Sequence, residues 1–137
     1  EQANNGDVRI IDYKTSKAPD MRFTGEYVFQ MRMYALLYRE QYQVTPKRTQ
    51  LLFLGGNPQV LTFDPTDADV SEFETELNDL WSDIAAHLRA KRFETRKSRL
   101  CDWCYFQNLC PVFGGTPPDL DPANVEKISE IGPAAAG

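Results

Sequence analysis

The first 63 residues carry a strand-like run, a helical stripe and two further strand-like runs, and this order restricts the folds open to the chain. Residues 8–14 are rich in β-branched side chains, as strands are. Residues 26–42 repeat apolar and aromatic side chains at helical spacing: Tyr27, Met31, Tyr34, Ala35, Tyr38 and Tyr42. Two runs, 48–54 and 59–63, again read as strands, and a second helical stripe covers about 68–90. This β–α–β–β–α order predicts an α/β or α+β fold with helices packed on a small mixed sheet.

The ends of this pattern predict how the chain is organised. Asn and Gly at positions 4–7 predict a tight turn, so the chain is expected to start inside a hairpin and to be a fragment of a longer protein. We expect one domain over 1–115 and a disordered tail over 116–137, which is rich in Pro, Ala and Asp. Breakers predict a loop over 15–24.

Composition excludes several classes of protein. Hydrophobic residues make up 42% of the 137 residues, which argues against wholesale disorder. No apolar stretch approaches the length of a membrane-spanning helix. The net charge of −5 excludes a global basic field, so any nucleic-acid contact must be local.

Three cysteines with the spacing C-x2-C-x5-C-P lie in a cysteine-rich segment, 99–113, at Cys101, Cys104 and Cys110. Thiolates at such spacing suit one soft metal centre, but a four-ligand cage lacks its fourth ligand. An odd number of cysteines argues against a disulfide framework and for a reducing, cytoplasmic compartment. A zinc site completed by a partner, or thiols that pair or stay free, are the alternatives.

Asp12 and Lys14 are the first candidate for chemistry. Alternate residues of a strand share a face, which places these two about 7 Å apart. A carboxylate can hold a hard divalent cation, to which the carbonyl of Tyr13 would add an oxygen, and an ammonium can stabilise charge on a phosphate. The pair suits metal-assisted phosphodiester hydrolysis. A solvated strand end is the alternative, and spacing alone favours it.

Two further groups of residues suit contacts with nucleic acid. Gln30 and Tyr34 lie four apart on one helix face and can orient a nucleotide or a water, although a core Tyr beside a rim Gln is the simpler interpretation. A basic run with interleaved aromatic residues suits a phosphate backbone and stacked bases, and a solvated helix end explains it equally well. Its candidate DNA-binding residues are Arg92, Arg96, Lys97 and Arg99.

Three sequence patterns, in this order, resemble the RecB-type branch of the PD-(D/E)xK nuclease superfamily. They are I-D-Y-K-T at 11–15, Q-x-x-x-Y at 30–34 and the cysteine triplet. The resemblance covers nearly all of 1–115 and is nearest to short stand-alone RecB-like exonucleases of bacteria, with relatives in AddB. It implies a restriction-endonuclease-like core and a DNA exonuclease that acts in repair or recombination. Its expected partner is a helicase subunit or the missing N-terminal part of the same protein.

The resemblance also implies a role for each matching residue. Asp12 would ligate Mg2+ or Mn2+, Lys14 would be the catalytic lysine, and Gln30 and Tyr34 would lie near the active site and the DNA. The cysteines would be three of four ligands of a structural 4Fe–4S cluster.

Two residues of the family pattern are missing from this sequence. The family places a second metal-binding Asp on the strand before the hairpin turn, where this chain has Glu1, Gln2 and Ala3. The first cluster cysteine is absent as well. The chain alone is therefore expected to be inactive, or nearly so, with an incomplete cluster. The alternative is a non-catalytic DNA-binding or zinc/iron–sulfur structural module.

Overall fold

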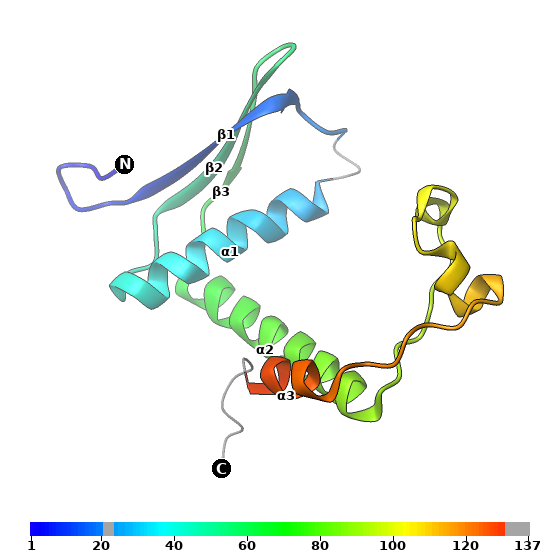
Figure 1. Ribbon diagram of the computed structural model, residues 1–137. Helices are drawn as coiled ribbons and strands as arrows, with labels where there is room; N and C mark the ends of the chain where they lie inside the picture. Colours follow the sequence, from blue (N-terminus) through cyan, green and yellow to red (C-terminus); the bar gives the residue numbers. More distant parts are fainter. Residues whose placement is uncertain (21–23, 131–137) are drawn as a thin grey trace. The chain divides into compact units, whose positions relative to one another are not determined.

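The computed structural model describes residues 1–20 and 24–130, and its elements follow the predicted order (Figure 1). The bounds are β1 Arg9–Lys17, α1 Gly25–Tyr42, β2 Arg48–Gly55, β3 Gln59–Phe63, α2 Asp67–Ala90, η2 Arg99–Trp103, η3 Gln107–Leu109, η4 Pro111–Phe113 and α3 Pro122–Glu130. The chain divides into two compact units, 1–77 and 78–137, and α2 runs through the boundary between them. The described helices include none that is both long and apolar enough to cross a membrane.

The three strands form one sheet in the order β1-β2-β3, with β1 parallel to β2 and β2 antiparallel to β3. Parallel neighbours need a crossover, and α1 supplies it. The β2–β3 hairpin turns at Gly56, whose φ of 71° lies in the left-handed region that glycine adopts without strain. The sequence prediction of a small mixed sheet with helices is confirmed.

The chain enters the sheet through the predicted tight turn. Gln2 bridges Val8 in antiparallel fashion, and the N–H of Ala3 donates to the carbonyl of Asp7 at 2.8 Å. Gly6 has a φ of 87°, which explains the glycine at this position. The described residues before β1 thus form a short hairpin, as the turn sequence predicts.

The core of the first unit lies between the sheet and α1, which runs along the sheet in Figure 1. Leu51 and Phe53 of β2 are fully buried and pack with Met31 of α1. The first turns of α2 supply a second cluster, in which Val70 and Phe73 pack on α1. Burial of such side chains contributes about 1.5–3 kcal/mol each, so these two clusters hold α1 at a fixed position over the sheet.

The pairing of β1 with β2 contains one irregularity. Lys14 is opposite Phe53, but Lys17 is opposite Gly55, so three steps along β1 match two steps along β2. One residue of β1 is therefore extra, which is the definition of a β-bulge. The predicted loop 15–24 is wrong at its start, since 15–17 belong to β1, and part of it, 21–23, lies outside the described residues.

The second unit contains the cysteine-rich segment and α3. The segment is built of three short 3-10 helices, η2 to η4. Pro122–Glu130 forms α3 inside the tail that composition alone predicts to be disordered. Residues 131–137 of that predicted tail lie outside the described residues.

Candidate active site

Asp12 and Lys14 extend from the middle of β1 toward the face of the sheet that α1 covers. They are paired with Leu51 and Phe53, both buried on that face. Lys14 Nζ lies 2.9 Å from Asp12 Oδ2, and about a quarter of each side chain is exposed. The expectation that both side chains share one face is correct, and the two form a half-buried ion pair rather than a solvated strand end.

Tyr34 brings α1 into the same group. Its hydroxyl donates a hydrogen bond to Asp12 Oδ2 at 2.8 Å. Packing of Tyr34 against the cluster of Met31 and Phe53 fixes the direction of the ring. Gln30 lies one helical turn before Tyr34 and is half-buried, and its amide makes no hydrogen bond with the rest of the described chain. The structure thus places three of the predicted residues in direct contact, with the fourth one turn away.

The protonation states of this group follow from its contacts. Partial burial acts to raise the pKa of Asp12, but hydrogen bonds from Lys14 and Tyr34, with the charge of Lys14, outweigh it and hold that pKa below its ordinary value. Burial, together with the hydrogen bond to Asp12 and its negative charge, raises the pKa of Tyr34. At neutral pH Asp12 is therefore a carboxylate, and Tyr34 is a neutral donor.

The donor set fits a divalent cation in part. Both described hydrogen bonds reach Oδ2 of Asp12, so Oδ1 has no partner among the described residues and can face a cation. The backbone carbonyl of Tyr13 follows directly in β1, while the side chain of Tyr13 is exposed. No group of three or more His, Cys, Asp or Glu side chains suited to a metal ion occurs within residues 1–20 and 24–130. Asp12 would have to be joined by water or by ligands from elsewhere.

The family resemblance implies that Tyr34 lies near the active site, but the residue patterns do not predict its direct hydrogen bond to Asp12. Spacing within a strand or within a helix indicates which side chains share a face, but it does not show which helix turn lies over which strand residue. Asp12 and Tyr34 are 22 positions apart in the sequence, and the residues between them contain no signal for that register. Only the packing of α1 on β2 sets it.

The predicted DNA-binding residues lie in the second unit. Arg92, Arg96, Lys97 and Arg99 are all exposed. Arg92 forms an ion pair with Glu94 at 3.0 Å, and Lys97 lies 5.5 Å from the ring centre of Phe113. The Asp12 group belongs to the first unit, and these four residues belong to the second.

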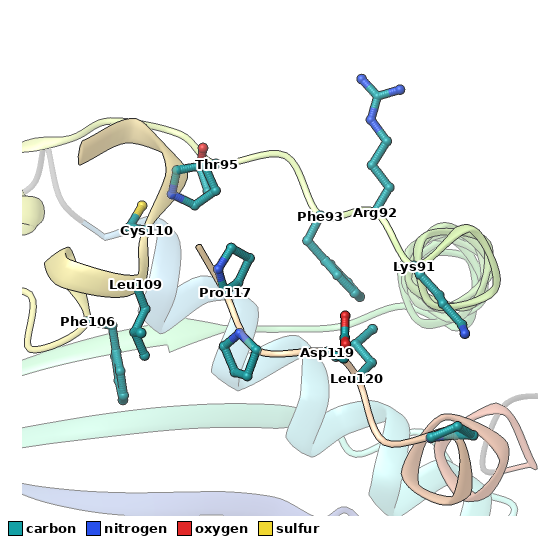
Figure 2. A pocket seen from close by; sticks show the side chains of 13 residues that line it. Lys91, Arg92, Phe93, Thr95, Phe106, Leu109, Cys110, Pro117, Asp119 and Leu120 are labelled. Carbon is teal, nitrogen blue, oxygen red and sulfur yellow. The ribbon is translucent and has the colours of Figure 1, made fainter. Parts of the chain in front are cut away.

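A pocket of about 1020 Å³ lies within the second unit, between the chain after α2 and the cysteine-rich segment. Figure 2 shows Phe93 directed toward Leu120 across the pocket, while Arg92 points away from it. Phe106 and Leu109 line the same pocket. The lining is mostly apolar, and the basic side chain closest to Phe93 in sequence is turned outward.

The cysteines do not form the expected metal cage. Within the part of the chain that the structure describes, Cys101, Cys104 and Cys110 are free thiols and are not gathered as a metal-binding group. Cys101 belongs to η2 and Cys104 caps its C-terminal end, where the N–H of Cys104 donates to the carbonyl of Cys101 at 3.1 Å. Cys110 lies between η3 and η4, and its N–H donates to the carbonyl of Gln107 at 3.1 Å. The described chain therefore gives no support for the 4Fe–4S cluster that the resemblance implies.

Comparison with known proteins matches most of the chain to one superfamily. A model of the PD-(D/E)XK nuclease superfamily matches residues 1–111. The Gene 69 protein of Mycobacterium phage L5 is 28% identical over 111 residues, which are 80% of this chain. The chain spans 36% of the length of that curated relative. No solved structure gives a significant match. The three-stranded mixed sheet with its helices is consistent with a restriction-endonuclease-like core.

Proposed function

This chain belongs to the PD-(D/E)XK nuclease superfamily, and from that premise we propose that its protein is a metal-dependent DNA exonuclease of RecB type. The observation that carries the proposal is the contact of Lys14 and Tyr34 with one oxygen of Asp12, at 2.9 and 2.8 Å. Superfamily members act on DNA phosphodiesters. In such chemistry a carboxylate can hold the metal ion, and an ammonium can stabilise negative charge on the phosphate.

In this proposal each residue has a separate task. Asp12, with the carbonyl of Tyr13, holds Mg2+ or Mn2+, which supplies Lewis-acid activation of water and of the phosphate when bound. Lys14 stabilises the negative charge that develops on the phosphate and orients the attacking water. Tyr34 keeps the Asp12 carboxylate in place and charged. Gln30, whose amide is free among the described residues, orients a nucleotide beside the scissile bond.

The exposed cations of the second unit are proposed to contact DNA as well. Arg92, Arg96, Lys97 and Arg99 would hold the phosphate backbone through charge rather than base recognition. An exonuclease of this type would serve DNA repair or recombination in the cytoplasm, with a helicase as its candidate partner. A cluster on the cysteines forms no part of the proposal, because these thiols do not gather in the described chain.

We further propose that the 137-residue chain cleaves weakly or not at all by itself. The reason is the absence, from the described residues, of any group of three or more metal-ligating side chains around Asp12. One carboxylate leaves a divalent cation mostly held by water, and tight binding usually needs further protein ligands.

Cleavage of an end-labelled DNA by the longer protein tests the proposal. Asp12→Asn and Lys14→Ala are each expected to slow Mg2+-dependent cleavage by roughly 10²-fold or more, because each removes charge from the reacting centre. Asp79→Asn, an exposed carboxylate on α2, is the matched control and should cleave like the wild type. Full cleavage by both site variants would refute the roles given to Asp12 and Lys14. A wild-type protein that binds DNA but does not cleave it would refute the nuclease assignment and support a non-catalytic module.

A further inference from the structure

The bulge in β1 changes the side of the sheet on which Lys17 lies. In a regular strand, residues an odd number of positions apart point to opposite faces, so Lys17 would face away from Lys14. The extra residue of the bulge places Lys17 opposite Gly55, two positions after Phe53 in β2. Paired residues of neighbouring strands share a face, so Lys17 is brought to the same side of the sheet as Asp12 and Lys14.

Two glycines of β2 and its turn make room for this arrangement. A Cβ on Gly55 would lie 2.6 Å from the backbone of Ser16, closer than real atoms approach. A Cβ on Gly56 would lie 3.4 Å from Cγ and Cε of Lys17, so the aliphatic stem of the lysine runs past this glycine. The aliphatic part of the Lys17 side chain thus lies beside the backbone of Gly56, whereas the residue as a whole is exposed to solvent.

The charge of Lys17 is not neutralised by the described chain. Lys14 is paired with Asp12 at 2.9 Å, but Lys17 has no carboxylate partner within residues 1–20 and 24–130. Lys17 follows Lys14 by three residues, which is at most about 10 Å along a strand. A nucleic-acid strand carries one phosphate per roughly 3.4 Å of helix axis, so an ammonium at this distance meets a phosphate other than the one beside Lys14.

We propose that Lys17 is a phosphate-binding residue that holds the DNA strand beside the scissile position, with the bulge opposite Gly55 placing it there. The inference rests on the proposed function and adds to it a second backbone contact on the sheet face of the candidate active site. Lys17 is a positioning residue, because it acts on a neighbouring phosphate and not on the reacting atoms.

Binding of a fluorescein-labelled single-stranded oligonucleotide to the chain, with Ca2+ in place of Mg2+, tests the proposal. Lys17→Ala should raise Kd roughly five- to tenfold and reduce the slope of log Kobs against log[salt] by about one. Lys17→Arg should keep both values near the wild type. Lys47→Ala is the matched control, since Lys47 is also exposed but lies at the opposite end of β1, where its N–H donates to the carbonyl of Val8.

The outcomes separate this inference from the function on which it rests. If Lys17→Ala binds with the Kd and the salt slope of Lys47→Ala while the wild type binds DNA and the longer protein cleaves it, the role of Lys17 is refuted and the nuclease assignment stands. If the wild-type chain fails to bind DNA at any salt concentration, the role of Lys17 is refuted, whereas the nuclease assignment is decided by cleavage in the longer protein. Circular dichroism spectra that match among the variants ensure that a change in Kd reports the lost charge.

Discussion

At the scale of single residues, the site is organised around one carboxylate oxygen. Asp12 Oδ2 accepts a hydrogen bond from the hydroxyl of Tyr34 and forms an ion pair with Nζ of Lys14. Both distances are shorter than 3 Å. These contacts overcome the effect of partial burial and hold the pKa of Asp12 below its ordinary value. The sequence indicates correctly that Asp12 and Lys14 share a face, because strand alternation is a local rule. The contact of Tyr34 depends on tertiary packing and has no local signal.

Replacement of Tyr34 by Phe tests whether the Tyr34 hydroxyl lowers the pKa of Asp12. Loss of the hydroxyl removes one hydrogen bond to the charged form, so the pKa of Asp12 should rise, and the free energy of unfolding should fall by about 1 kcal/mol. A 13C NMR titration of the Asp12 carboxyl in the 137-residue chain measures the first effect, and urea unfolding measures the second.

The pH dependence of stability should change in the same variant. Because the pKa of Asp12 is lower in the folded chain, its carboxylate contributes stability above the unfolded value of about 3.9, and this is lost as the pH falls through the folded value. In Tyr34→Phe, the free energy of unfolding should therefore fall less steeply as the pH is lowered through the folded pKa of Asp12. Tyr38→Phe, one turn further along α1, is the control, and an identical titration of Asp12 in both variants would contradict the role given to Tyr34.

At the scale of elements, the bulge in β1 is the feature that sequence patterns cannot supply. The run 8–14 is read correctly as a strand, but its last residues look like a loop because Thr, Ser and Lys carry no alternating apolar pattern. The strand continues to Lys17 because β2 offers Gly55 as a partner without a side chain. In the sequence, a glycine at this position indicates only the turn that follows it. Its close approach to the backbone of β1 is seen only in the structure.

Replacement of Gly55 by Ala should therefore destabilise the sheet. The added Cβ would meet the backbone at 15–17 at 2.6 to 2.7 Å, and backbone cannot move aside as a flexible side chain can. We expect a loss of about 1–3 kcal/mol in the free energy of unfolding, measured with urea. Gly25→Ala is the control, since nothing lies within 4 Å of its added Cβ and alanine favours the helix. Equal stabilities of the two variants would contradict the close approach of β1 and β2.

At the scale of the whole molecule, the predicted sheet with its helix and the predicted cysteine-rich segment belong to different units of the chain. The first unit, 1–77, holds the sheet, α1 and the Asp12 group, and its element order could be read from periodicity. The second unit, 78–137, holds the cysteines and the predicted DNA-binding cations. The described chain does not support the expected 4Fe–4S cluster, because its cysteines are not gathered as a metal-binding group. The helix α3 was not predicted because the Pro-, Ala- and Asp-rich composition of the tail favoured disorder.

Binding of a divalent cation at Asp12 is the central claim, and it can be tested in this chain whether or not the chain cleaves DNA. Mn2+ is paramagnetic and broadens the NMR signals of nuclei near it. Titration of the 15N-labelled chain with Mn2+ should broaden first the amide signals of β1 around Asp12 and Tyr13 and those of α1 around Tyr34, and Asp12→Asn should abolish this effect. Broadening that spares these residues, or that persists unchanged in Asp12→Asn, would contradict the claim.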